Sequence, residues 1–275
     1  MNFDLPPTEQ TGPIRDLETL SIAELTAGMQ SSLAAVEQAV TNALPAANAL
    51  IEALVQRMKQ GGRLFYIGAG TSGRLGVIDA SECPPTFGID PGVVIGLIAG
   101  GDGALRIAVE GAEDNSEGAW SDLQAFQPNT MDTVLGIAAS GRTPYVIGGL
   151  QQARDAGLLT GCIACNPDTE VERVAEYALV AVTGPEFITG STRLNAGTAT
   201  KLLLNMITTV TMIQLGHVRG SQMVDMRPSN KKLVERGVRM IIEATGLDAD
   251  RALSLLSSTG SVRAAIDQAI GDARA

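Results

Sequence analysis

The sequence has 275 residues, of which 45% are hydrophobic and only 3% are aromatic, so we expect an aliphatic core. The formal net charge of -10 disfavours nucleic acids and anionic membranes as partners, because both bind clustered Lys and Arg side chains. No apolar run approaches the roughly 20 residues of a membrane span, and the start, MNFDLPPTEQTG, lacks the features of a signal or transit peptide. Three cysteines, an odd number, suit a reducing compartment, so we expect a cytoplasmic protein.

The first predicted element is helical. Apolar residues recur at three- and four-residue spacing over residues 21–60, a pattern typical of amphipathic helices. Pro45 is expected to divide this stretch into two helices, because proline removes a helical hydrogen bond. We interpret residues 1–60 as an N-terminal helical segment that packs on the domain after it.

Strands and helices alternate over residues 61–228. Short apolar runs predict the strands, and a stretch typical of a helix follows most of them. This alternation favours right-handed crossovers and a parallel sheet with helices on both faces, a three-layer α/β fold. The expected strands are 63–70, 93–101, 133–140, 160–166 and 177–182, and the expected helices begin at about Thr71 and span 104–126, 144–157 and 193–217.

The final segment, residues 229–275, has helical patterns without a strand. Gly246 and Gly260 separate three predicted helices, and Asp248 and Ser261 are reasonable N-caps. We predict a small helical domain here.

A glycine-rich loop follows the first predicted strand. Gly68, Gly70 and Gly73 reproduce the G-x-G-x-x-G spacing of dinucleotide-binding folds, which alone is a weak signal. Such folds place an acidic residue at the end of the next strand, but here Asp90 precedes that strand and Asp102 comes too late. A dinucleotide is therefore disfavoured, and a tight turn without a ligand is the plainer alternative.

Two hydroxyl groups in the same loop suggest a different ligand. Thr71 and Ser72 lie where the main-chain N–H groups of a helix start favour an anion. We expect this loop to bind a phosphate group.

A second loop of this kind follows strand 133–140 and contains Ser140, Gly141, Arg142 and Thr143. Ligands of open α/β sheets bind at the carboxyl ends of the strands, so the two loops are expected to hold one phosphate through hydroxyl and amide donors. The sequence has neither a Walker lysine nor a set of Mg²⁺ ligands at these loops. We predict a phosphosugar ligand, with no metal and no cofactor.

Several long blocks resemble one enzyme family. They are YIGAGTSGRLGVIDASECPPTFG (66–88), EGAEDN (110–115), AASGRTPYVIGG (138–149), TGPEFITGSTRLNAGTATKLLLN (183–205) and QMVDMRPSNKKLVERG (222–237). They are similar to the N-acetylmuramic acid 6-phosphate etherases, whose sugar isomerase (SIS) type α/β domain the fold prediction matches, and the similarity covers nearly the whole chain.

The resemblance implies a homodimer with a terminal helical domain similar to ubiquitin-associated modules. It also implies release of D-lactate from N-acetylmuramic acid 6-phosphate, which leaves N-acetylglucosamine 6-phosphate in peptidoglycan recycling. The N-terminal TEQTGPIRDLETLS departs from the Thr-Glu-x-Arg-Asn start of many relatives, so the role of that segment stays open.

The implied chemistry needs one base and one acid. An ether resists direct hydrolysis at neutral pH, whereas removal of the proton beside the open-chain aldehyde allows lactate to leave before water adds. By resemblance, Glu82 matches the proton donor to lactate and Glu113 matches the second catalytic glutamate, the expected base. Glu110 and Asp114 compete with Glu113, and a solvated surface glutamate is the plainer interpretation of any one of them.

The pair Cys162 and Cys165 spells C-x-x-C, which invites a redox or zinc interpretation. Residues three apart in a strand point to opposite faces, and a zinc ion would lack ligands because the chain has one histidine, His217. We predict that both cysteines are core residues, that His217 packs or caps a helix, and that Cys83 packs or touches substrate. The candidates to bind phosphate or the lactyl carboxylate through a positive charge are Arg74, Arg142, Arg193 and Lys201.

Two other functions fit the phosphate loops. One is a regulator that binds a sugar phosphate without chemistry, like the SIS-type glucokinase regulatory proteins, although those resemble two fused SIS units. The other is an aldose-ketose phosphate isomerase, which shares the base but needs no acid for a leaving group. Release of D-lactate distinguishes the etherase from both.

Overall fold

Five parallel strands form one sheet, in the order β2-β1-β3-β4-β5. All five predicted strands are present, and β1 and β3 flank the point at which the winding direction reverses. The computed structural model describes residues 5–274, so residues 1–4 and 275, the ends of the predicted terminal segments, lie outside it. The strands are β1 (Leu64–Gly68), β2 (Val94–Ile98), β3 (Thr133–Ile137), β4 (Leu159–Ala164) and β5 (Tyr177–Val180).

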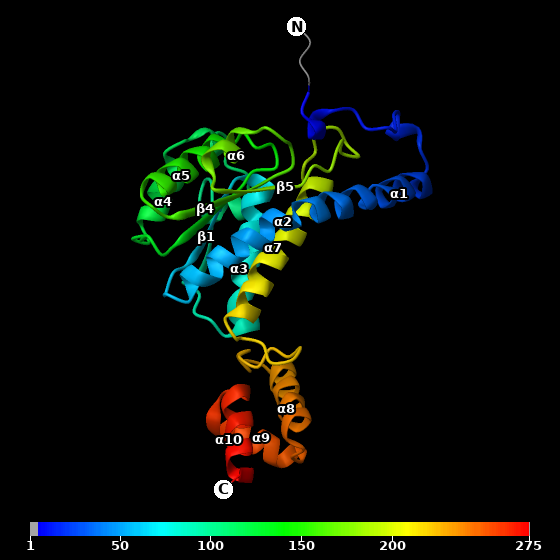
Figure 1. Ribbon diagram of the computed structural model, residues 1–275. Coiled ribbons are helices and arrows are strands. Elements are labelled where there is room, and N and C mark those ends of the chain that lie inside the picture. The colour runs from blue at the N-terminus through cyan, green and yellow to red at the C-terminus, as the bar shows by residue number, and fades with distance from the viewer. Residues whose placement is uncertain (1–4, 275) are drawn as a thin grey trace.

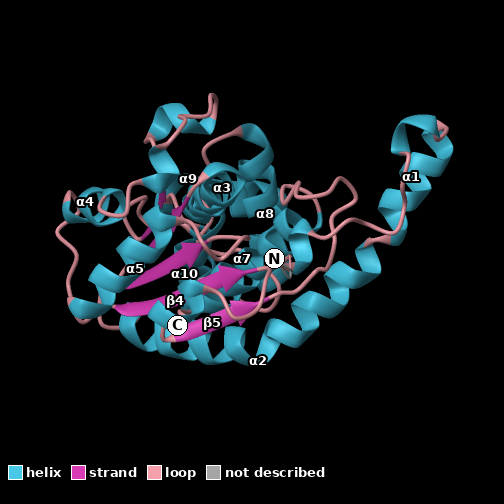
Figure 2. Ribbon diagram, turned by 90° about the horizontal axis from the view of Figure 1, so that it is seen from above, coloured by secondary structure: helices cyan, strands magenta, loops and turns pink. Residues whose placement is uncertain are grey.

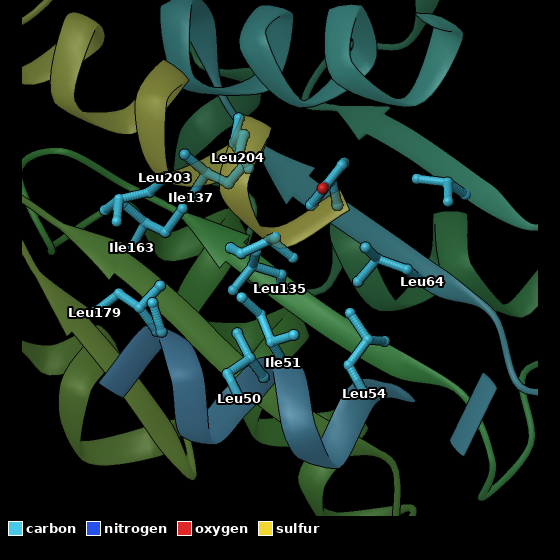
Figure 3. Close-up of a cluster of buried hydrophobic side chains, with 14 of the residues drawn as sticks. Leu50, Ile51, Leu54, Leu64, Leu135, Ile137, Ile163, Leu179, Leu203 and Leu204 are labelled. Carbon is cyan, nitrogen blue, oxygen red and sulfur yellow. The ribbon is translucent and has the colours of Figure 1, made fainter. Parts of the chain in front are cut away.

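Helices cover both faces of this sheet, which confirms the three-layer prediction (Figure 1). Along β1, Leu64 and Tyr66 join the core on one face, and Phe65 and Ile67 join the core on the other. Figure 3 shows part of the first of these cores, in which mostly aliphatic side chains from the helices and the strands pack together. The helices on this face are α2 (Leu33–Met58), α3 (Gly70–Phe87) and α7 (Asn195–Gln214), and those on the other are α4 (Gly118–Gln124), α5 (Pro144–Asp155) and α6 (Glu170–Val174).

The predicted helix break at Pro45 is wrong. Helix α1 (Ile22–Ser31) begins with a capping box at Ser21, and α2 starts directly after Ser32 and continues through Pro45. Pro45 and Thr41, whose carbonyl loses its helical partner, are both exposed, so water can satisfy that carbonyl. The proline therefore destabilises α2 only a little, because the carbonyl that it leaves unpaired lies on the exposed face of the helix.

The predicted helix over 104–126 is also wrong. The segment forms two short 3-10 turns, Asp102–Leu105 and Ala112–Asp114, before α4 begins at Gly118. Gly111 has a φ of 73°, in the left-handed region that ends a right-handed helix. The chain from Arg106 to Gly111 is exposed and irregular, and it lies at the same end of the sheet as the glycine loop.

The small helical domain is present after the sheet domain and has a core of its own (Figure 1). Asp248 caps a helix as predicted, since its side chain accepts from the N–H of Arg251 at 2.9 Å, and Gly246 and Gly260 end helices with positive φ. Within residues 5–274 no helix is long and apolar enough to cross a bilayer. The three helices are α8 (Lys231–Thr245), α9 (Ala249–Thr259) and α10 (Val262–Arg274).

Candidate active site

The glycine loop turns tightly from β1 into α3. A Cβ atom on Gly68 would lie 2.7 Å from the backbone N of Gly73, so the strand end and the helix start approach more closely than any side chain allows. Thr71 and Ser72 lie in the first turn of α3 and are half-buried. The first N–H groups of a helix have no partner inside it, so this turn presents amide and hydroxyl donors together.

The second loop follows β3 and leads into α5. Ser140 Oγ accepts from the N–H of Arg142 at 3.2 Å, and Thr143 is the N-cap residue before Pro144. Gly141 has a φ of 71°, and a Cβ there would lie 2.3 Å from Thr169. Only glycine allows this turn, which directs the loop back across the strand end.

The structure brings these two loops together. Gly68 of β1 pairs in register with Ile137 of β3, so both strands end at the same level of the sheet. The loops therefore lie side by side at the point where the winding direction reverses, which is the usual ligand position in open α/β sheets.

Glu113 lies beside the glycine loop. It lines a cavity of about 140 Å³ between the start of α3 and the segment 104–113. The other charged residues of this cavity are Arg74 and Glu110. Glu110, Glu113 and Asp114 are all exposed, but Asp114, the second competitor of Glu113, does not line the cavity. The remaining lining residues are Ala69, Gly70, Ala99, Ala104, Ala108, Val109, Gly111 and Ala112.

Glu82 lies elsewhere in the same chain. It is exposed on α3 and does not line the cavity that contains Glu113. Ten residues separate it from Ser72, which corresponds to about 15 Å along a helix axis. One copy of the chain therefore does not bring the two proposed catalytic glutamates together.

No pattern in the sequence pointed to the half-buried carboxyl group of Asp79. Its carboxylate accepts from the Tyr66 hydroxyl at 2.8 Å and from Thr208 Oγ1 at 3.3 Å, which joins α3 to β1 and α7. Burial raises the pKa of Asp79 to about 6. Asp79 lies one helical turn before Glu82, so these bonds fix the part of α3 that carries Glu82.

The N-terminal segment reaches the same edge of the sheet. The buried Thr8 donates its backbone N–H to Asn166 Oδ1 at 3.0 Å, and Asn166 Nδ2 donates to the carbonyl of Ala139 at 3.1 Å. Ala139 directly precedes Ser140. The segment whose role the sequence leaves open is therefore attached to the second loop.

The three cysteines are buried, and the histidine contacts an aspartate rather than a candidate site residue. Cys162 and Cys165 are fully buried in different clusters, as predicted, and burial raises the pKa of each thiol to about 12. Cys83 is also buried. His217 lies 3.0 Å from an Asp225 carboxylate oxygen, just after α7. Over residues 5–274, no group of three or more His, Cys, Asp or Glu side chains could hold a metal ion.

The basic candidates differ in their surroundings. Arg142 and Arg193 are exposed, and Lys201 Nζ donates to Asn205 on its own helix at 2.9 Å. Arg74 alone among them lines the cavity with Glu113.

Known proteins resemble this chain along nearly its whole length. A protein named N-acetylmuramic acid 6-phosphate etherase from Christiangramia forsetii is 52% identical over 267 residues, which cover 97% of this chain and 97% of that protein. Its namesake from Bacteroides fragilis is 54% identical over 260 residues, which cover 94% of this chain and 92% of that protein.

Two other comparisons concern the α/β domain. The family model of the glucokinase regulatory protein N-terminal SIS domain matches residues 47–154. A solved phosphoheptose isomerase from Francisella tularensis shares the fold, with a TM-score of 0.53 and 18% identity over 69% of this chain and 99% of that one. The two etherases, in contrast, are identical at more than half of the aligned positions, and the alignments cover 97% and 94% of this chain. This chain belongs to the N-acetylmuramic acid 6-phosphate etherase family.

Proposed function

We propose that this protein cleaves the D-lactyl ether of N-acetylmuramic acid 6-phosphate by elimination and water addition. The products are D-lactate and N-acetylglucosamine 6-phosphate, and the role is recycling of cell-wall amino sugars in the cytoplasm. The observation that carries the proposal is the position of Glu113 beside a glycine loop, in a chain 52% identical to an etherase.

The phosphate group is assigned to the two loops at the carboxyl edge of the sheet. The start of α3 offers amide N–H groups and hydroxyls, and the adjacent loop offers further donors within reach of the same ligand. The proposed phosphate-binding residues are Thr71, Ser72, Ser140, Gly141, Arg142 and Thr143.

Glu113 is the proposed base. From the wall of the cavity it would remove the proton on the carbon beside the aldehyde of the open-chain sugar, and the electrons of that C–H bond form an enolate. Collapse of the enolate breaks the C–O bond to lactate, and Glu82 is the proposed acid that protonates the departing oxygen. Water then adds to the double bond and leaves a hydroxyl group where lactate was.

Because Glu82 lies outside the Glu113 cavity of its own chain, we propose a homodimer in which Glu82 of a second copy completes the site. Exposed apolar side chains support such a contact. Ile78, one turn before Glu82, is 53% exposed, and α1 buries none of its residues and leaves Ile22 82% exposed. Figure 2 shows α1 extending away from the sheet domain.

We further propose that the SIS domain spans residues 61–228, between the N-terminal helical segment 1–60 and the small helical domain 229–275. The negative net charge supports a small-molecule substrate rather than nucleic acid or membrane.

A direct assay tests the function. The protein is incubated with N-acetylmuramic acid 6-phosphate, and D-lactate and N-acetylglucosamine 6-phosphate are measured; we expect equal amounts of both. Binding of the sugar phosphate without turnover would instead favour a regulator, and aldose-ketose interconversion without lactate would favour an isomerase.

A further inference from the structure

Arg74 forms part of the cavity wall and holds the segment opposite. It lies two residues after Ser72 on α3 and is half-buried. Its Nε donates to the carbonyl of Leu105 at 3.0 Å, and one terminal nitrogen donates to the carbonyl of Ala104 at 2.7 Å. These bonds join the start of α3 to the segment that carries Glu113.

The Arg74 guanidinium has unused donors. It has five N–H groups, of which the two carbonyls take two. Among the described residues no ion pair joins Arg74 to a carboxylate, whereas four other arginines each pair with an aspartate. A half-buried arginine with only neutral partners suits an anion that arrives with the ligand.

The cavity has the size of a substituent rather than of a whole sugar phosphate. Its volume is about 140 Å³, whereas pockets for complete small-molecule ligands usually have at least about 300 Å³. Apart from Arg74, Glu110 and Glu113, every lining residue is Ala, Gly or Val. The cavity thus offers one cation, two carboxylates and small apolar walls to the part of the substrate that enters.

We propose that Arg74 binds the carboxylate of the lactyl group and so selects the leaving group. The inference rests on the proposed function. That substrate has two anionic groups, and the loop hydroxyls and amides account for the phosphate, which leaves the lactyl carboxylate without a cation. Beside Glu110 and Glu113 an unpaired carboxylate is repelled, and Arg74 offsets this repulsion. Its bonds to backbone carbonyls hold the guanidinium in place, so binding costs little side-chain entropy.

The test compares two substrates that differ only in charge. One is N-acetylmuramic acid 6-phosphate and the other is its lactamide, in which a neutral carboxamide replaces the carboxylate. Formation of N-acetylglucosamine 6-phosphate gives kcat/KM for both. We expect the parent protein to prefer the acid by about tenfold to hundredfold, the value of a charge-assisted hydrogen bond. In Arg74→Gln we expect the two values to become equal.

The matched control is Arg106→Gln, which removes the same charge from an exposed residue on the facing segment that does not line the cavity. It should keep the preference for the acid. Arg74→Lys keeps the charge but cannot form the same pair of hydrogen bonds, so its preference for the acid should lie between those of the parent protein and Arg74→Gln. If Arg74→Gln does not fold, Arg74→Lys takes its place in the test.

Two outcomes overturn this inference and leave the proposed function intact. One is a parent protein that cleaves both substrates equally well. The other is an Arg74→Gln variant that is slower on both substrates by the same factor, which would mean that Arg74 only holds the segment 104–113 in place. If the parent protein cleaves neither substrate, the proposed function itself fails, and this inference fails with it.

Discussion

Glu113 and Glu82 have different surroundings, and this difference suits different roles. Glu113 lies on a short turn against the glycine loop, where a bound sugar phosphate would bring its reacting carbons. Glu82 is exposed on α3, and in the proposed dimer it would act on a substrate held by the other copy of the chain. Proton removal must come first in an elimination of this kind, because no electrons are available to expel lactate until the C–H bond breaks.

The order of steps predicts how the two glutamine variants differ. Glu82→Gln should still exchange the proton beside the aldehyde with solvent deuterium while it releases little lactate, because the enolate can form and be reprotonated. Glu113→Gln should lose both exchange and release. Each substitution should lower the rate of the step that it affects by a factor of about 10² to 10⁴. NMR of the sugar in deuterated water, run beside a lactate assay, measures both.

Asp114→Asn is the matched control for these variants, since Asp114 is the exposed neighbour of Glu113 outside the cavity. It should keep both activities. If Glu82→Gln abolishes exchange while Glu113→Gln preserves it, the two roles are reversed; parent rates in both variants would transfer the catalytic role to Glu110.

At the scale of elements, α3 connects the candidate site to the core. Its first turn carries the proposed phosphate donors, its middle carries Glu82, and Asp79 between them is hydrogen-bonded to β1 and α7. The raised pKa of Asp79 means that the folded protein binds a proton there more tightly than the unfolded chain does. The stability of the fold should therefore increase as pH falls through about 6 towards the ordinary pKa of aspartate.

Asp79→Asn tests this connection. The amide oxygen still accepts from the Tyr66 hydroxyl, and the amide NH2 group can donate to Thr208 Oγ1, which can donate to the carbonyl of Leu204. Because the amide has no charge to bury, the free energy of unfolding at pH 7.5 should rise by on the order of 1 to 3 kcal/mol. The gain should shrink as pH falls to 5. Urea unfolding across this pH range measures it, with the exposed Asp155→Asn as control. A gain that does not change with pH would exclude ionisation of Asp79 as its cause.

The elements also show what a sequence can and cannot predict here. The three central strands, β1, β3 and β4, were predictable because a strand buried on both faces is almost entirely apolar, and this property is local. The edge strands β2 and β5 are only partly buried but have short apolar runs of the same kind. The continuation of α2 through Pro45 was not predictable, because the destabilisation by a proline depends on whether the carbonyl of Thr41 faces water. The motifs identified the residues of the two loops, and the register of β1 with β3, set by long-range pairing, brings those loops together.

At the scale of the whole molecule, the separation of Glu82 from the Glu113 cavity predicts a composite site. Sedimentation at micromolar concentration should give a species of twice the 28.5 kDa chain mass. Mixing Glu82→Gln with Glu113→Gln under conditions of subunit exchange should restore activity, because half of the dimers would be mixed and one of their two sites would hold both glutamates. The recovered activity should approach about a quarter of the parent value.

Sedimentation of a 28.5 kDa species alone would contradict this arrangement. A dimer whose mixed variants stay inactive would show instead that both glutamates act from the same chain. Mixing two samples of the same variant is the control, since such mixtures contain no complete site.

The bond between Thr8 and Asn166 joins residues 158 positions apart in the sequence. During synthesis the ribosome releases the N-terminal segment long before β4 and the asparagine that follows it, so the segment has no place to dock until most of the sheet domain has emerged. Closing so long a loop also costs chain entropy that only a formed sheet offsets. The edge of the sheet that carries Ser140 is therefore completed late, and a nascent chain acquires the proposed phosphate-binding edge only after its sheet has formed.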